Sequence, residues 1–330
     1  MDRMDKRILI LHSGALGDFI ATLPVLSALR RQQPDAWLEV LARGRYAALA
    51  EGIANKTGDI ELCGAHELFA AGGAPAASTF SHYISSFDFV ISWLGYEFSA
   101  GKGGPCVTNV PPTPTEGQPA SQFFFKCIPL LAADEFVPPR VTVLPIEDQQ
   151  AEELLARHGV AGQRPLAALH PGSGGPRKCW PAARFAQVAA SLLQHGWQVL
   201  MIEGEADRVP VGQVLAAMES AALKPAAVMR NLPLRLLAAV LGRCRAYLGN
   251  DSGISHLAAA AGTRCRVIFG PTDPAVWAPV GENVEVLTAN IPCRPCRQTR
   301  PECDHLGCLA GVSAHRVVRA MLHTAAHERA

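Results

Sequence analysis

Residues 7–18 read RILILHSGALGD, an apolar run followed by two glycines and an aspartate. The run is short, continuous and rich in Ile and Leu, which predicts a buried parallel strand over residues 7–12. Residues 19–32 then space their apolar side chains along one helix face, and Pro24 is expected to kink or restart that helix. The glycines between strand and helix let the backbone approach a ligand closely, or they serve only a tight turn.

The alternation of strand and helix continues along the chain, which predicts βαβ units and parallel sheets. It favours two doubly wound α/β halves, over residues 1–146 and 147–310, and a C-terminal helix within 311–330. Residues 95–122 are rich in Gly, Pro, Thr and Ser and are expected to form a long surface loop. Further strands are predicted over 36–42, 87–93, 136–145, 165–171, 197–204, 226–230, 245–251 and 264–270, and helices over 147–159, 181–196, 210–221, 233–244, 253–262 and 312–329.

Composition narrows the possible functions. The chain has 330 residues, 49% hydrophobic and 18% charged, so it is long enough for two domains with sizeable cores. A net charge of +1 argues against a nucleic-acid binder held by a large basic surface. No apolar run is long enough for a membrane span and the first residues do not resemble a signal peptide, so the cytoplasm is the expected compartment.

Polar clusters follow several predicted strands, where ligands of open α/β sheets bind. HPGSGGPRKCWP (170–181) offers a glycine turn with Lys178, which suits a phosphate, although a solvated loop has the same composition. GNDSGISHLAAAAG (249–262) begins a helix, whose N–H groups suit a diphosphate, although an Asp or Ser cap with a packed histidine explains it as well. IEGEADR (202–208) is a weaker third cluster, and Asp18 is equally compatible with a helix N-cap.

The sequence also raises the questions of a nicotinamide cofactor and of a zinc site. The glycines at 14 and 17 do not form G-x-G-x-x-G, and Arg43 and Arg45 follow the second strand where a dinucleotide fold needs an acidic residue, so a nicotinamide cofactor is disfavoured. The ten cysteines are expected to be thiols or ligands rather than disulfides. Four of them, with the spacing C-x2-C-x6-C-x4-C, either hold a structural zinc or are plain thiols: Cys293, Cys296, Cys303 and Cys308.

With these residues in view, the chain resembles glycosyltransferase family 9, the lipopolysaccharide heptosyltransferases. The resemblance is carried by GALGDFIATLP, HPGSGGPRKCWP and GNDSGISHLAAAAGT with the later VIFGPTDP and WAPVG, in this order. It implies a GT-B fold, in which two Rossmann-like doubly wound parallel-sheet domains face a cleft, the first on the acceptor side and the second binding the nucleotide sugar. It further implies inverting transfer, without a bound metal or other cofactor, from an ADP-sugar, typically ADP-L-glycero-β-D-manno-heptose, to Kdo or a first heptose of the lipopolysaccharide inner core.

The resemblance also implies roles for individual residues. Asp18 matches the general base, and Gly17 leaves space beside it. The remaining matches bind the donor: Ser173 and Lys178 its phosphates, Glu205 the ribose, Leu232 the adenine, and Asp251, Ser252, Gly253, Ile254 and His256 the diphosphate and sugar.

The match has departures and alternatives. HPGSGG lacks a threonine found in the best-known members, and no acceptor site can be aligned, although Arg43, Arg45 and Lys102 are candidates for an anionic acceptor. A lipid-linked acceptor would bring the protein to the cytoplasmic face of the inner membrane as a peripheral protein. A sugar-nucleotide epimerase of GT-B fold, or a non-catalytic sugar-nucleotide-binding protein, would share many of these features.

Overall fold

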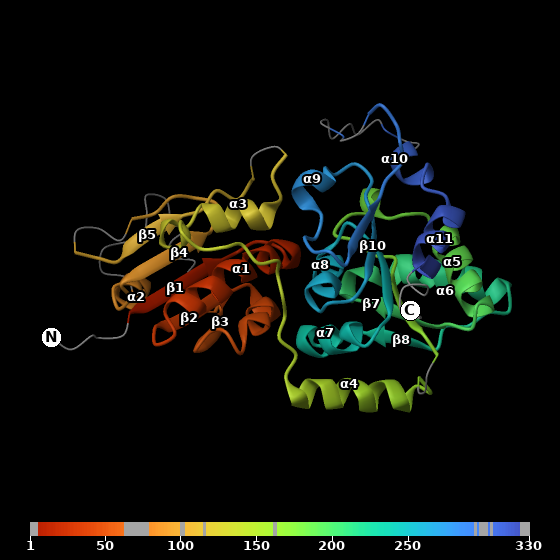
Figure 1. The fold of residues 1–330 in the computed structure, drawn as a ribbon, viewed down its shortest axis with the longest axis horizontal. Coiled ribbons are helices and arrows are strands. Elements are labelled where there is room, and N and C mark those ends of the chain that lie inside the picture. Colours follow the sequence, from red (N-terminus) through yellow and green to blue (C-terminus); the bar gives the residue numbers. More distant parts are fainter. Residues whose placement is uncertain are drawn as a thin grey trace. The chain divides into compact units, whose positions relative to one another are not determined.

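The computed structural model describes residues 6–62, 79–99, 103–114, 117–160, 164–293, 296, 303 and 306–323. The chain divides into two compact units, Met1–Val141 and Thr142–Ala330, drawn in Figure 1 from red to yellow and from green to blue. Each unit is an α/β domain built on its own parallel sheet. None of the helices in the described ranges is long and apolar enough to cross a membrane.

The described strands of the first unit form a five-stranded parallel sheet in the order β3-β2-β1-β4-β5. The order reverses between β1 and β4, and at this switch point His12, the last residue of β1, pairs with Trp93, the last of β4. Alternate residues of β1 face opposite sides of the sheet, and Leu9 and Leu11 pack with Phe80 of α2. The elements are β1 (Arg7–His12), α1 (Leu16–Gln32), β2 (Trp37–Ala42), η1 (Gly44–Ala50), β3 (Lys56–Asp59), α2 (Thr79–Ile84), β4 (Phe89–Trp93), β5 (Cys106–Asn109), α3 (Ala120–Lys126) and η3 (Pro129–Leu131).

The first helix differs from its prediction. α1 begins at Leu16, not at residue 19, and runs without interruption through Pro24. A proline inside a helix costs about 3 kcal/mol. Leu23, Val25 and their neighbour Leu26 are fully buried, and each such side chain contributes about 1.5–3 kcal/mol, so burial outweighs the proline.

Two other predictions for this unit were wrong. The expected surface loop over 95–122 contains a strand, β5, and the start of α3. β5 is only four residues long and pairs in parallel with β4. The expected strand over 136–145 is irregular up to Leu144, after which α4 begins. Pro138 and Pro139 lack the N–H groups that a strand needs. β3, on the sheet edge, was not predicted at all.

The described strands of the second unit form a six-stranded parallel sheet in the order β11-β10-β9-β6-β7-β8, with the switch point between β9 and β6. α5 packs with α6 and α11 on one side, and α4 packs with α7, which in turn contacts α8 (Figure 1). The elements are α4 (Pro145–Arg157), β6 (Leu166–His170), η4 (Pro176–Lys178), α5 (Ala182–Gln194), β7 (Gln198–Glu203), η5 (Glu205–Asp207), α6 (Arg208–Ser220), β8 (Ala227–Arg230), α7 (Leu234–Gly242), β9 (Ala246–Asn250), α8 (Gly253–Ala260), β10 (Cys265–Ile268), α9 (Pro274–Trp277), β11 (Val284–Leu287), α10 (Gly307–Ala310) and α11 (Ala314–His323).

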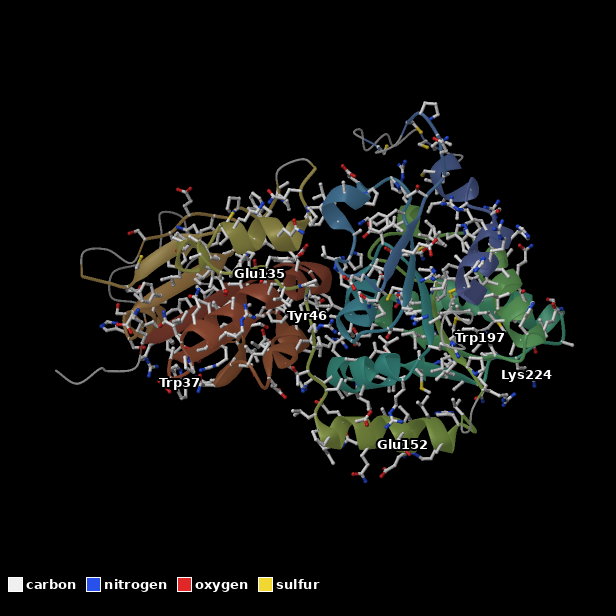
Figure 2. The ribbon with its side chains drawn as sticks, in the orientation of Figure 1. Trp37, Tyr46, Glu135, Glu152, Trp197 and Lys224 are labelled. Carbon is white, nitrogen blue, oxygen red and sulfur yellow. The ribbon has the colours of Figure 1, made fainter. Side chains whose placement is uncertain are left out.

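The core of this unit holds its strands in place. Leu169 of β6 and Met201 of β7 are fully buried against Phe185 of α5, and Trp197, labelled in Figure 2, closes the same cluster. The remaining predicted strands and helices of this half are confirmed to within a few residues, whereas α9, α10 and β11 were not predicted. The helix predicted over 312–329 is described only as α11, because residues 324–330 lie outside the described ranges.

Candidate functional site

The carboxyl edge of the second sheet gathers most of the predicted donor residues. Ser173 and Lys178 follow β6, Glu205 follows β7, Leu232 follows β8, and the stretch 251–256 follows β9. Since the strands lie in the order β9-β6-β7-β8, these residues form a continuous row along one edge. The row begins at the switch point, where open α/β sheets bind their ligands.

Hydrogen bonds tie the loop after β6 to the end of β9. Asn250, fully buried, accepts from the N–H of Trp180 (3.0 Å) and donates through Nδ2 to the carbonyls of Pro171 (2.8 Å) and Gly172 (3.2 Å). Ser173 Oγ donates to the carbonyl of Asp251 at 2.6 Å. The Ser173 hydroxyl therefore orders the loop in this structure, and Asn250, which was not singled out in the sequence, fixes both of its ends.

The start of α8 has several features that favour an anion. The side chain of Ser252, the N-cap, accepts from the N–H of Ser255. The N–H groups of Gly253 and Ile254 belong to the first turn, where a helix offers no carbonyl of its own, and the helix dipole adds positive potential. Lys178 Nζ lies 2.8 Å from Oδ2 of Asp251, which is 7% exposed, so a cation is held directly beside this turn.

Of the other predicted donor residues, one lies on α8 and two follow β7 and β8. His256 is half-buried on α8, and its N–H donates to the carbonyl of Ser252. Glu205 is exposed at the start of η5. Leu232 is half-buried directly after β8, next to Asn231, whose positive φ of 49° turns the chain there.

His170, the last residue of β6, was not predicted as a site residue. It is 1% exposed, and its two ring nitrogens contact residues that follow the strands on either side. Nε2 lies 2.9 Å from Oδ2 of Asp207, and Nδ1 lies 3.4 Å from Oγ of Ser252. Burial would raise the pKa of Asp207, but the hydrogen bond from His170, helped by the N–H of Gly204, holds that pKa below its usual value.

The position of Asp207 explains one glycine of the loop after β6. A Cβ on Gly172 would lie 1.7 Å from Oδ1 of Asp207, far inside any contact distance. The missing side chain of Gly172 is therefore the space that the carboxylate of Asp207 occupies. In the sequence, HPG (170–172) and GEAD (204–207) each lie at the end of a predicted strand. Their spacing does not show that Gly172 and Asp207 lie in contact.

In the first unit, Asp18 lies near the carboxyl end of β1. It is the third residue of α1, not the N-cap as considered above, because the helix begins at Leu16 and Ala15 occupies the cap position. Asp18 Oδ2 accepts from the N–H of Ala15 at 3.1 Å, which anchors the carboxylate at the helix start. Gly17 lies beside it in the first turn.

The turn before α1 has room only for a glycine at position 14. A Cβ at this position would lie 2.9 Å from Cε1 of His12 and 3.1 Å from Cβ of Asp18. His12 is 1% exposed, and its Nδ1 has no hydrogen-bond partner among the described residues. Burial, with a smaller contribution from the charge of Arg43, lowers the pKa of His12 to about 4. His12 is therefore neutral at pH 7, with its ring against Phe19.

The remaining candidates lie elsewhere or outside the described residues. Lys102 lies outside them, whereas Arg43 pairs with Glu61 at 3.1 Å just after β2. Cys308 is buried in α10, while Cys293, at the start of the cysteine-rich segment, is exposed. Within the described part of the chain, no group of three or more His, Cys, Asp or Glu side chains is placed to hold a metal ion.

The fold and the motifs agree with a family of known proteins. Residues 131–306, more than half of the chain, match the model of glycosyltransferase family 9 (heptosyltransferase). The chain belongs to this family, and its two parallel-sheet α/β domains are those of the GT-B fold.

Individual relatives share part or all of this architecture. Lipopolysaccharide heptosyltransferase 1 of Pseudomonas aeruginosa is 35% identical over 132 residues, which cover 40% of this chain and 36% of that protein. The match thus spans well under half the length of this curated relative. Among solved structures, a family 9 glycosyltransferase from Veillonella parvula superposes with a TM-score of 0.77 at 21% identity, covering 98% of each chain. The ADP-heptose lipopolysaccharide heptosyltransferase II of Escherichia coli superposes with a TM-score of 0.71 at 18% identity, covering 97% of this chain and 98% of that one.

Proposed function

We propose that this protein transfers a heptose from ADP-heptose to an inner-core acceptor of lipopolysaccharide, a Kdo or a first heptose. Membership of the heptosyltransferase family supports the reaction class. The names of the relatives, which include an ADP-heptose lipopolysaccharide heptosyltransferase, support the donor and the acceptor.

The row of polar residues along β9-β6-β7-β8 carries this proposal. Adjacent strands lie about 4.8 Å apart, so the row spans about 14 Å, a length that suits an extended nucleoside diphosphate. We place the phosphates at the start of α8 with Lys178, the ribose beside Glu205 and the adenine near Leu232. The order of groups in ADP then follows the order of the strands.

The residues of this row have to stabilise the negative charge of the leaving group. When the bond between the anomeric carbon and the phosphate oxygen breaks, the electron pair stays on the diphosphate. Lys178, the N–H groups of Gly253 and Ile254 and the helix dipole stabilise that charge in our proposal. We therefore expect transfer to persist in the presence of a chelator such as EDTA, and loss of transfer in EDTA would contradict this part of the proposal.

Asp18 is our candidate for the general base. The acceptor oxygen attacks the anomeric carbon from the face opposite the diphosphate, and its proton goes to the Asp18 carboxylate. The hydrogen bond from Ala15 holds Oδ2 of that carboxylate at the start of α1. Displacement of this kind inverts the anomeric centre, so a β-linked donor is expected to give an α-linked product, which nuclear magnetic resonance of the product tests.

The acceptor determines where the enzyme acts. Since the inner core is built on a lipid, we expect a peripheral protein at the cytoplasmic face of the inner membrane. Co-sedimentation with vesicles containing acceptor lipid, compared with vesicles lacking it, tests this expectation. Equal pelleting with both kinds of vesicle would contradict recognition of the acceptor.

Thermal stabilisation by sugar nucleotides tests the donor, because a ligand that binds only the native state raises its melting temperature. We expect stabilisation by ADP and ADP-heptose and none by UDP-glucose. A transfer assay with ADP-heptose and Kdo-containing lipid A then tests the reaction. Conversion of the donor alone to a new sugar nucleotide would identify an epimerase instead, and binding without turnover would identify a non-catalytic binding protein.

A further inference from the structure

We infer that Asp207, His170 and Ser252 form a proton-linked relay, through which His170 takes up a proton when a nucleoside diphosphate binds at the start of α8. The inference rests on the proposed function, because it needs a diphosphate at this helix. It assigns a positioning role to two buried residues, His170 and Asp207, that the mechanism above does not use. Its consequence is that nucleotide affinity depends on pH.

The three residues come from three adjacent strand ends. His170 ends β6, Asp207 follows β7 on one side, and Ser252 follows β9 on the other. The distances are 2.9 Å from Nε2 of His170 to Asp207 and 3.4 Å from Nδ1 to Ser252. A continuous hydrogen-bonded chain therefore runs from a buried carboxylate to the cap of the helix that we expect to receive the diphosphate.

The chemistry of the two partners decides where the protons lie. An ionised carboxylate only accepts, so Nε2 of His170 carries a hydrogen and donates it to Asp207. In the neutral ring Nδ1 is then a bare acceptor, and it takes the hydroxyl hydrogen of Ser252. In that state, Ser252 has only lone pairs to offer to a phosphate.

Protonation of Nδ1 reverses the bond to Ser252. The imidazolium donates to the oxygen of Ser252, and the hydroxyl hydrogen of Ser252 becomes available to a phosphate oxygen. Ser255 does not replace it, because its Oγ donates to the carbonyl of Asn250 and its N–H donates to Ser252. Binding of a phosphate therefore favours the doubly protonated His170, which also places a positive charge close to the ligand.

Most other titratable groups near His170 keep their protonation state near neutral pH. Asp207, on the β7 side, has a lowered pKa and stays ionised. The thiol of Cys179 stays neutral, because burial and, to a smaller extent, Asp207 raise its pKa; burial likewise raises the pKa of Tyr247 on β9.

The β9 side also holds the ion pair of Asp251 with Lys178, which flanks the start of α8. His256 on α8 is the other histidine near the bound diphosphate, and it is the rival that an experiment has to separate from His170. Histidine is the side chain that ordinarily changes charge between pH 5 and 8.

Calorimetry of ADP binding to the full-length protein tests the relay. At pH 7.5 the terminal phosphate of ADP is largely ionised already, since phosphate monoesters lose their second proton near pH 6. Titrations in buffers of different ionisation enthalpy then report protons taken up by the protein. We expect uptake of at least about half a proton per ADP, and an affinity that falls as the pH rises from 6 to 8.5, because the bound state holds the extra proton.

Variants locate the proton. His170→Gln is expected to abolish uptake and flatten the pH dependence of affinity, and Asp207→Asn to reduce both, because the positive ring loses its counter-charge. His256→Gln should retain the uptake. His195→Gln is the matched control, since this exposed histidine lies at the end of α5, and it should behave as the wild type.

The outcomes are separable. Binding of ADP to the wild-type protein without proton uptake would overturn the relay and leave the proposed function standing, and this measurement needs no variant to fold. Uptake that persists in His170→Gln but disappears in His256→Gln would also overturn it. Failure of ADP to bind at all would overturn the nucleotide site and the relay with it.

Discussion

The two units place a buried histidine at the same point and use it differently. His12 ends β1 and His170 ends β6, each is the last residue of the strand beside its switch point, and each precedes a glycine-containing turn. His12 packs against Phe19 in an apolar setting that lowers its pKa to about 4. His170 is instead bonded to the carboxylate of Asp207.

This difference matches the chemistry that we assign to each unit. The first unit holds the neutral ring of His12 near the carboxylate of Asp18, so His12 itself adds no positive charge there when Asp18 accepts a proton. The second unit collects Lys178, a helix N-terminus and a histidine able to take a proton, all of which favour an anion. In our proposal, the same architecture serves proton transfer in one unit and diphosphate binding in the other.

Two matched glycine substitutions are expected to have the largest effects and to separate the roles of the two units. Gly14→Ala pushes a methyl group against His12 and Asp18, and Gly172→Ala pushes one into the carboxylate of Asp207. A displacement of about 1 Å at a catalytic group lowers turnover about 100-fold. We expect this loss of kcat for Gly14→Ala with unchanged ADP affinity, and a loss of ADP affinity for Gly172→Ala.

The control for this pair is Gly212→Ala on α6, where an added Cβ meets nothing within 4 Å. Transfer kinetics and ADP calorimetry on all three variants report the two effects separately. If Gly14→Ala and Gly172→Ala changed the same parameter, the division of labour between the units would be wrong.

Removal of the cation in the second unit should have the next largest effect. Lys178→Gln deletes a charge-assisted bond, which is worth about 2 kcal/mol, so ADP should bind about 30-fold more weakly. Arg177→Gln, one residue earlier on η4, removes a positive charge that is not paired with Asp251 and serves as the control. Equal losses in both variants would point to a general electrostatic effect rather than a specific contact.

The smallest expected effect is the contribution of His12 to the pH dependence of the free energy of unfolding. Its pKa rises from about 4 in the folded protein to about 6.5 on unfolding, so the unfolded chain binds more protons between these values. The stability that the neutral ring contributes is complete above pH 6.5 and is lost as the pH falls toward 4. Between pH 7 and pH 5.5 the loss should be about 1 kcal/mol.

Denaturant unfolding of wild type and His12→Leu at these two pH values measures this contribution. The wild type should lose about 1 kcal/mol more than the variant on acidification, because the variant has no titrating group at this position. Identical changes in both proteins would show that His12 is not held neutral by the fold.

Much of the architecture could be predicted from the sequence, because the buried strands are unbroken apolar runs and the helices keep a regular apolar spacing. The predictions failed where local signals conflicted with packing. Pro24 suggested a break in a helix that burial of Leu23 and Val25 keeps intact. β5 is a four-residue edge strand in a Gly- and Pro-rich stretch, with too few residues to show a period.

The candidate site was predictable only in part, for a related reason. Ser173, Lys178 and the residues around Asp251 stand in glycine-rich turns, which mark strand ends in the sequence itself. His170 and Asp207 meet across two strands, 37 residues apart, and no local pattern reports such a contact. Asn250 likewise reads as one more residue of a strand, although its side chain ties two loops together.

The central claim is that Asp18 performs proton transfer while the second unit holds the nucleotide. Asp18→Asn tests it most directly, because asparagine keeps an acceptor for the N–H of Ala15 and removes the charge and the basicity of the carboxylate. We predict that transfer from ADP-heptose falls by about 1,000-fold, that ADP affinity stays within twofold, and that Asp35→Asn, at an exposed position of the same unit, changes neither. Retained transfer in Asp18→Asn, or a loss of ADP affinity that matches the loss of transfer, would contradict the claim.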